Sequence, residues 1–400
     1  MNVRQLSLSS TAGHWADTGP RLLAATGDPR NREVMSGLPY HFWRYGTDAG
    51  VIDGVATADL GGGEAVRRAA WNATQLALGR GLGGHQFTDA RNQRLWPAPP
   101  PSGSTVINVF QLFPRPVIRD DSVRKVFFID QTLTQLFDHY GDHHRPISAR
   151  AMRRAIEWEW EGYQSADLVI VNSEWARMSV IADYGVRVGS TAVVPQAANF
   201  DPDVYAQWIE RVQHEPAPRA DDALRLVFVG VDPIRKGLDR LLRAMAAVNG
   251  RGRRITLDVI GVSSSSVPRE LAATRHVHWH GFVSKEHREQ LLMELIGRAD
   301  IGCLLSRAEA GGNCIREFHS LGLAVLGTTV GGSPDQALQG ASWLVSPDES
   351  DGAIADRLEW LCRDRDEVEA KKAYAWAHRD EVLWHRAIER IREPVDALAA

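Results

Sequence analysis

The chain of 400 residues contains very little lysine and very little cysteine. Only 5 of its 46 basic residues are lysine, and the other 41 are arginine. The three cysteines, Cys303, Cys314 and Cys362, are odd in number and lack the paired spacing of a metal site. A disulfide framework is therefore not expected, and we expect a reducing, cytoplasmic setting.

Long apolar runs and an excess of positive charge are also missing. No stretch approaches eighteen consecutive apolar residues, so no membrane-spanning helix is expected, and the polar start does not suit a secretory signal. The net charge is −4, with 20 basic and 19 acidic residues in 1–200 and 26 and 31 in 201–400, which argues against a nucleic-acid partner. The basic run 143–154 is interpreted as a solvated helix start, with peripheral contact to the inner face of a membrane as the alternative.

Short runs rich in Val, Ile and Phe alternate with helical patterns along the chain. In 63–79, for example, apolar residues recur at three- and four-residue spacing, which is typical of a helix. Runs of the strand type occur at 22–27, 105–110, 125–130, 166–173, 224–230, 255–261, 300–305 and 324–330. This alternation predicts an α/β fold with doubly wound parallel sheets.

The length and one polar segment indicate two domains. Four hundred residues exceed most single cores, and residues 206–222 are polar and contain prolines, as in a linker. We expect a Rossmann-like domain over 1–205, completed by a C-terminal helix over 383–400, and a second over 223–382. A cleft would lie between them, where the carboxyl ends of the strands face each other.

The stretch VFVGVDPIRKGLDRLL (227–242) has the character of a phosphate-binding loop. A buried strand ends at Gly230, the loop carries Arg235 and Lys236, and Gly237 opens a helix. Cations beside the positive end of a helix suit a diphosphate. The alternative is a solvated Arg-Lys pair on a turn.

A second stretch, AEAGGNCIREFHSLG (308–322), places two carboxylates eight positions apart. Gly311 and Gly312 separate Glu309 from the helix that carries Glu317, and glycines allow backbone N–H groups to approach a ligand closely. The two carboxylates could accept hydrogen bonds from a sugar and a ribose. The alternative is that both are solvated and Glu317 pairs with Arg316 or its neighbours.

In order and spacing these stretches resemble the retaining glycosyltransferases of family 4, which have the GT-B fold of two facing Rossmann-like domains. The loop from Gly230 to Lys236-Gly237 is similar to that family's G-x5-K-G loop, and Glu309 and Glu317 match its E-x7-E motif. Further similar segments are 27–42, 163–186, 193–200, 280–301, 327–335 and 383–391. The resemblance covers nearly the whole chain and is weakest at about 64–125.

The resemblance assigns roles to residues of the second domain. It implies that Lys236, assisted by Arg235, neutralises the donor diphosphate. Backbone N–H groups at Gly311, Gly312, Asn313 and Cys314 would hold its other side. Glu309 would orient the transferred hexose and Glu317 the ribose, while Phe282 and Val283 would lie near the base.

On the acceptor side, the resemblance implies Ser36, Gly37 and Tyr40. Asp130 follows a strand at the position where many members have a histidine, and it completes the expected catalytic set with Glu309 and Lys236. An ionised aspartate accepts hydrogen bonds but donates none.

The implied reaction is transfer of a hexose from a nucleotide diphosphate sugar to a glycan, lipid-linked or small-molecule hydroxyl, in a bacterial setting. Retention by a front-face mechanism is expected, without metal or cofactor. Two alternatives remain: a nucleotide-sugar epimerase or phosphorylase on the same fold, and a non-catalytic sugar-nucleotide-binding partner.

Overall fold

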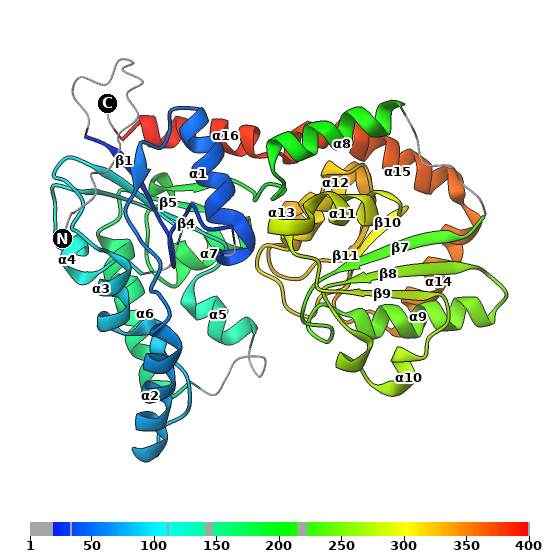
Figure 1. Ribbon diagram of the computed structural model, residues 1–400, viewed down its shortest axis with the longest axis horizontal. Coiled ribbons are helices and arrows are strands. Elements are labelled where there is room, and N and C mark those ends of the chain that lie inside the picture. Colours follow the sequence, from blue (N-terminus) through cyan, green and yellow to red (C-terminus); the bar gives the residue numbers. More distant parts are fainter. Residues whose placement is uncertain (1–18, 33, 110–111, 141–146, 215–221, 399–400) are drawn as a thin grey trace. The chain divides into compact units, whose positions relative to one another are not determined.

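Figure 1 shows a computed structural model of the chain, which describes residues 19–32, 34–109, 112–140, 147–214 and 222–398. The chain divides into two compact units. The first comprises 1–171, 177–194 and 388–400, and the second comprises 172–176 and 195–387. Each unit is built around one parallel six-stranded sheet.

The sheet of the first unit has the strand order β2-β1-β3-β4-β5-β6. Its strands are β1 (Arg21–Ala24), β2 (Gly54–Val55), β3 (Thr105–Asn108), β4 (Arg124–Ile129), β5 (Leu168–Val171) and β6 (Thr191–Val193). Its helices are α1 (Leu38–Asp48), α2 (Glu64–Ala77), α3 (Asp89–Leu95), α4 (Arg115–Ile118), α5 (Leu133–His139), α6 (Ala149–Gln164) and α7 (Glu174–Ala182). Short 3-10 turns lie at Val34–Gly37, His85–Phe87 and Val188–Ser190. The central strands β3, β4 and β5 thus coincide largely with the apolar runs predicted around 105, 125 and 166, as expected of parallel strands buried on both faces.

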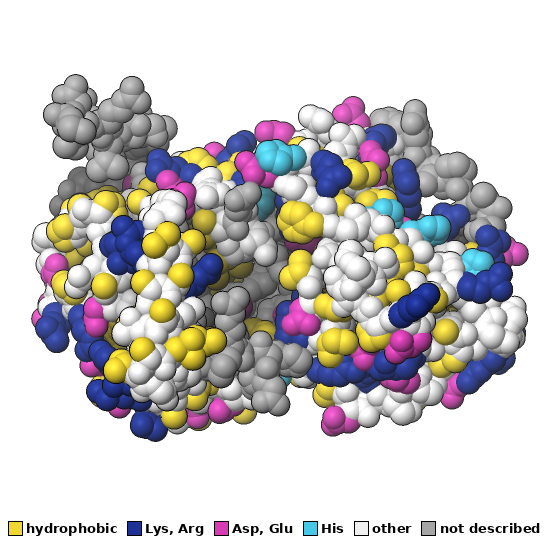
Figure 2. Space-filling view, turned by 60° about the horizontal axis from the view of Figure 1, so that its bottom comes forward, with side chains coloured by type: hydrophobic (Ala, Val, Ile, Leu, Met, Phe, Trp, Pro, Cys, Tyr) yellow, Lys and Arg dark blue, Asp and Glu magenta, His cyan; other side chains and the backbone are white. Residues whose placement is uncertain are grey.

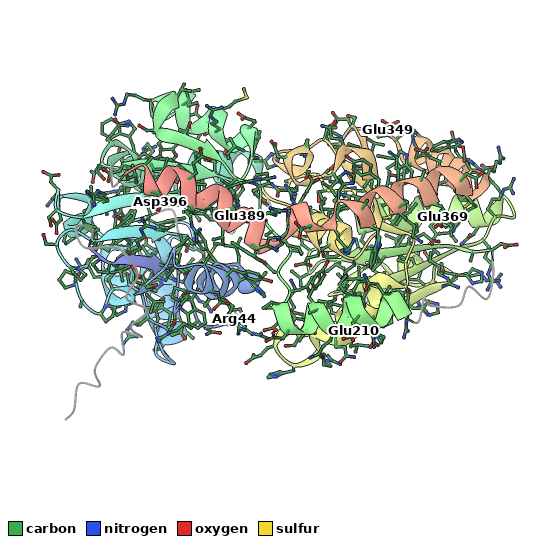
Figure 3. All side chains as sticks on the ribbon, turned by 90° about the horizontal axis from the view of Figure 1, so that it is seen from above. Arg44, Glu210, Glu349, Glu369, Glu389 and Asp396 are labelled. Carbon is green, nitrogen blue, oxygen red and sulfur yellow. The ribbon has the colours of Figure 1, made fainter. Side chains whose placement is uncertain are left out.

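The last helix, α16 (Trp384–Asp396), contributes its C-terminal part to the first unit. Ile391 and Val395 are buried, and Asp396, labelled in Figure 3, forms an ion pair of 2.7 Å with Arg21 of β1. Arg392 also donates to the carbonyl of Ala49, just after α1. These contacts tie the end of the chain to the first strand and first helix.

The sheet of the second unit has the order β12-β11-β10-β7-β8-β9. Its strands are β7 (Leu224–Val229), β8 (Ile255–Ile260), β9 (Val277–Gly281), β10 (Ile301–Leu304), β11 (Ala324–Thr328) and β12 (Ser342–Val345). Its helices are α8 (Pro202–His214), α9 (Leu238–Gly250), α10 (Arg269–Ala272), α11 (Lys285–Gly297), α12 (Asn313–Ser320), α13 (Ser333–Gln336), α14 (Asp351–Arg363) and α15 (Arg365–Ala377). Short 3-10 turns lie at Ser264–Ser266, Gln339–Ala341 and Arg379–Val382.

Helices cover both faces of this second sheet (Figure 1). Leu241, Met245 and Leu358 of α9 and α14 pack in one apolar cluster, whereas Leu292 and Phe318 of α11 and α12 belong to another. The two clusters lie on opposite sides of the strands, because successive side chains of a strand point to opposite faces. The second unit is therefore a three-layer α/β sandwich.

The segment expected to be a linker, 206–222, is largely helical. Residues 206–214 belong to α8, and residues 215–221 lie outside the described part. Trp208 is 4% exposed and packs on Gly297, where an added Cβ would lie 2.6 Å from the indole ring. The polar pattern led to a wrong prediction because this helix buries only one side, while Glu210, labelled in Figure 3, lies on the exposed side.

Figure 2 shows Lys and Arg side chains interspersed with Asp and Glu on the visible face. Within the described ranges, no helix combines the length and the apolar character that crossing a bilayer requires.

Candidate functional site

The expected site residues of the second unit lie in loops that follow β7, β9 and β10. All strands of this sheet are parallel, so these loops leave from the same edge. In open α/β sheets ligands bind at that edge, outside the carboxyl ends of the strands.

The loop after β7 brings Arg235 and Lys236 to this edge. The stem of Lys236 crosses Gly230, where an added Cβ would lie 2.4 Å from the lysine Cδ. Gly237, which precedes α9, has φ 73°, and its own Cβ would lie 2.0 Å from the carbonyl oxygen of Leu305. Both glycines are required because the backbone or a side chain passes too close for a larger residue.

Glu309 is the point at which these cations converge. Its Oε2 atom lies 3.2 Å from Arg235 Nη1 and 3.7 Å from Lys236 Nζ, and it accepts a hydrogen bond of 3.3 Å from Ser306 Oγ. Arg235 also donates to the carbonyl of Ala308 at 2.7 Å. The carboxylate is 7% exposed, so it is not the solvated charge of the alternative interpretation.

In this cluster, burial and the neighbouring opposite charge shift the pKa of each group in opposite directions. Burial alone would raise the pKa of Glu309, but Lys236 and Arg235 outweigh it and hold the pKa below its ordinary value. Burial would likewise lower the pKa of Lys236, and Glu309 instead raises it. Both groups are therefore charged near neutral pH. Cys314 is different, because burial raises the pKa of its thiol to about 11 and keeps it neutral.

Gly311 and Gly312 form the turn that leads into α12. Gly312 is in the left-handed conformation (φ 58°, ψ 44°), and α12 begins at Asn313. A Cβ on Gly311 would lie 2.5 Å from the Gln196 side-chain nitrogen. Gly332, after β11, donates its N–H to the carbonyl of Glu309 at 3.2 Å, which holds this loop from the other side.

Glu317 lies one turn into α12 and is 3% exposed. It accepts hydrogen bonds from Lys285 Nζ and, at 3.4 Å, from Asn313 Nδ2. Arg316 does not serve as its partner as the alternative supposed, because that side chain donates to the carbonyl of Asp335 at 3.0 Å. The two carboxylates of the motif are thus buried, and each has its own lysine.

The two residues expected near a base follow β9. Phe282 is 69% exposed and Val283 is buried in the apolar cluster beneath α11. Phe282 therefore presents a free aromatic face, whereas Val283 contributes to the support of the loop. Lys285, two residues further on, starts α11 and turns toward Glu317.

In the first unit, the expected acceptor residues lie at the carboxyl ends of two strands of one sheet. Ser36 and Gly37 have φ 58° and 83° in the turn before α1, which follows β1, and Asp130 follows β4. Tyr40 is held by Arg32, whose guanidinium lies 4.6 Å from the ring centroid and donates to the hydroxyl at 3.2 Å. Because β1 and β4 both pair with β3 in parallel, these loops share one edge of the sheet.

Two further interactions of the site were not predicted. Arg307 pairs with Asp239 at the start of α9 through two hydrogen bonds of 2.8 and 2.9 Å, and its N–H donates to the carbonyl of Arg235. This pair fastens the loop of Lys236 to the loop of Glu309. The second interaction that was not predicted is that of Lys285 with Glu317. Because the chain has only 5 lysines, each of them could have been considered as a candidate site residue.

In the described part of the chain, no group of three or more His, Cys, Asp or Glu side chains is arranged to hold a metal ion. The two carboxylates of the motif are instead paired with basic side chains, Glu309 with Arg235 and Lys236 and Glu317 with Lys285.

Part of the chain matches a known protein family. Residues 223–364 match the family model described as Glycosyl transferases group 1. The chain is 27% identical over 273 residues to a D-inositol 3-phosphate glycosyltransferase of Corynebacterium jeikeium, covering 64% of this chain and 62% of the relative. It thus spans about three fifths of the length of the curated relatives that it matches.

Solved structures extend the likeness to the fold of the whole chain. Sucrose-phosphate synthase from Thermosynechococcus elongatus superposes with a TM-score of 0.64 at 16% identity, covering 95% of this chain and 98% of the other. HepE of Anabaena in complex with UDP gives a TM-score of 0.51 at 17% identity, covering 73% and 78%. The chain therefore has the GT-B fold, and its residues 223–364 resemble the Glycosyl transferases group 1 family.

Proposed function

We propose that the protein transfers a hexose-type sugar from a nucleotide diphosphate sugar to a hydroxyl acceptor, with retention of configuration. The observation that carries this proposal is the convergence of Arg235 and Lys236 on buried Glu309, beside the left-handed turn that opens α12. Such an arrangement combines a hydrogen-bond acceptor with two cations and a helix amino end. It suits a neutral sugar joined to a diphosphate.

Support for the donor class comes from the relatives. The curated relatives are glycosyltransferases by name, and HepE of Anabaena binds UDP and UDP-glucose in its solved complexes. UDP is accordingly the first donor nucleotide to test.

In the proposed mechanism, the cations act on the leaving group. Lys236 and Arg235 would stabilise the negative charge that develops on the diphosphate as the glycosidic bond breaks. The backbone N–H groups of Gly311, Gly312, Asn313 and Cys314 would bind the diphosphate at the amino end of α12. Glu309 would accept hydrogen bonds from hexose hydroxyls, Glu317 would bind the ribose, and Phe282 and Val283 would contact the base.

Retention is proposed to proceed on one face of the sugar. The acceptor hydroxyl would attack from the side of the departing diphosphate, whose oxygen would take the acceptor proton. Ser36, Gly37, Tyr40 and Asp130 are the proposed acceptor residues. Because Lys236 and Arg235 already supply positive charge, we propose that transfer requires no divalent cation, and activity should persist in the presence of EDTA.

Calorimetric titration with UDP tests the donor site. Lys236→Ala removes a cation from the diphosphate and Glu317→Ala removes an acceptor from the ribose, so each should weaken UDP binding by about tenfold or more, equivalent to about 1.4 kcal/mol. Lys371→Ala is the matched control, since this lysine pairs with Glu367 on α15, outside the site.

Unchanged UDP affinity in both site variants would contradict the proposed donor site. A product assay distinguishes the remaining alternatives: conversion of the sugar nucleotide without an acceptor would indicate an epimerase or phosphorylase, and binding without turnover would indicate a non-catalytic protein.

A further inference from the structure

Helix α2 has its apolar face on the outside of the molecule. Ala65, Val66, Ala69, Ala70, Ala73, Leu76 and Ala77 are all exposed, and Val66 and Leu76 expose 71% and 61% of their area. At 100° per residue these positions form one continuous side of the helix. An amphipathic helix of a globular protein normally turns this side inward, so its exposure requires an explanation.

The opposite side of α2, which faces the rest of the first unit, carries Glu64, Trp71, Asn72 and Gln75. Gln75 is its only buried residue, and Trp71 donates its indole N–H to the carbonyl of Gly83. Glu64, at the first turn, forms ion pairs with Arg91 and Arg94 of α3. Hydrogen bonds and ion pairs therefore fix the orientation of the helix, and the apolar side cannot simply rotate inward. In Figure 1 the helix extends away from the sheet of its unit.

Three exposed arginines flank this side of α2. Arg67 and Arg68 lie near the start of α2 and Arg80 follows its end, and all three are exposed. Within the described ranges none of these arginines forms an ion pair. The carboxylate of Glu64, in contrast, forms ion pairs with Arg91 and Arg94 of α3.

We propose that α2 is a membrane-contact helix that lies on an anionic lipid surface. Its apolar side would enter the boundary between headgroups and acyl chains, and Arg67, Arg68 and Arg80 would pair with lipid phosphates. This goes beyond the proposed reaction and does not depend on the donor that the second unit binds. With α2 on a bilayer, hydroxyl groups at the lipid surface would lie within reach of the protein as acceptors.

The charges favour a lipid surface over a second copy of the chain. Two α2 helices that paired through their apolar sides would bring six arginines together, and the only acidic side chain of each helix is already bound to α3. An anionic bilayer, in contrast, satisfies the apolar side and the cations at once.

Vesicle flotation of the full chain tests this proposal. The protein should float with vesicles of phosphatidylcholine and phosphatidylglycerol, remain unbound with phosphatidylcholine alone, and dissociate at high salt. The variant Arg67→Gln/Arg68→Gln should lower the partition coefficient about tenfold or more, and Val66→Ser/Leu76→Ser should abolish binding.

Arg187→Gln/Val188→Ser is the matched control, because both residues are exposed in the same unit but away from α2. It should bind vesicles like the unchanged protein, and thermal melting should confirm that every variant folds. UDP titration is run in parallel, so that failure of the donor site is recognised separately. The proposal is overturned if anionic vesicles do not bind, if the α2 variants bind unchanged, or if light scattering shows a dimer that Val66→Ser/Leu76→Ser dissociates.

Discussion

Glu159, on α6 of the first unit, is a fully buried carboxyl group outside the candidate donor site. It accepts hydrogen bonds from the N–H of Leu133 at 2.7 Å, from the Tyr163 hydroxyl at 3.1 Å and from the Tyr184 hydroxyl. Tyr184 in turn contacts Thr134. One side chain thereby holds the first turn of α5, which begins three residues after Asp130.

Burial raises the pKa of Glu159 to about 8, although its three hydrogen bonds oppose this. The folded state then binds a proton that the unfolded state, with a pKa near 4.5, releases. The contribution of Glu159 to stability is thus greatest below about pH 4.5 and decreases as the pH rises to about 8, by up to about 1.4 kcal/mol per pH unit.

Glu159→Gln should remove this dependence. Urea unfolding of the first unit, measured between about pH 5 and pH 8, should give a flatter stability profile for the variant than for the unchanged protein. Glu157→Gln, two residues earlier on the exposed side of α6, is the control and should leave the profile as it is. Parallel profiles for all three proteins would show that Glu159 is charged throughout.

At the scale of elements, helix α9 has a glycine at each end, and only the first of them lacks space for a side chain. Gly237 precedes the helix with φ 73°, and a Cβ added there would lie 2.0 Å from the Leu305 carbonyl oxygen, whereas Gly250 ends the helix with open space around it. The first glycine joins the Lys236 loop to β10, and the second has no such constraint.

Gly237→Ala should therefore destabilise the second unit by about 2 kcal/mol or more, from left-handed strain and displacement of the backbone. It should also weaken UDP binding, because Lys236 is the preceding residue. Gly250→Ala should be neutral or stabilise by up to about 1 kcal/mol through helix propensity. Chemical denaturation of the two variants measures both effects, and equal stabilities would refute the close approach of α9 to Leu305.

The elements also show why some predictions were confirmed and others were wrong. The central strands of both sheets could be predicted because strands covered on both faces are continuous apolar runs, as in 224–230 and 300–305. Helix α8 could not, because only one of its sides, with Trp208, is buried and the rest has the composition of a linker. Helix α2 was predicted as a helix, but its periodicity could not indicate that the apolar side faces outward.

In the candidate site, residues of local motifs could be predicted from the sequence, but contacts between residues far apart in the sequence could not. Local motifs identified the four residues Glu309, Glu317, Arg235 and Lys236. In the structure, Glu309 lies close to both Arg235 and Lys236. Lys285 lies 32 positions from Glu317, and Asp239 lies 68 positions from Arg307, so neither contact leaves a local pattern. The roles assigned to Ser36, Tyr40 and Asp130 stay predictions.

For the whole molecule, the chain divides into two compact units, and the residues of the proposed donor site belong to the second. A ligand stabilises the part of a protein that binds it, by about 2.7 kcal/mol at a hundred times its dissociation constant. Calorimetric melting with UDP should accordingly raise the transition of the second unit while the transition of the first stays in place.

In the variant Lys236→Ala the same UDP concentration should produce a smaller shift. An equal shift of both transitions would mean that the units melt as one, and no shift with any nucleotide diphosphate would contradict donor binding by the second unit.

The scarcity of lysine has a practical consequence for chemical footprinting. Of the five lysines, Lys125 is buried with its Nζ bonded to backbone carbonyls, and Lys371 and Lys372 lie on α15. The other two, Lys236 and Lys285, each contact a carboxylate of the candidate site. Amine-reactive labelling read by peptide mass spectrometry would therefore report directly on occupancy of this site, with the α15 lysines as an internal reference in the same molecule.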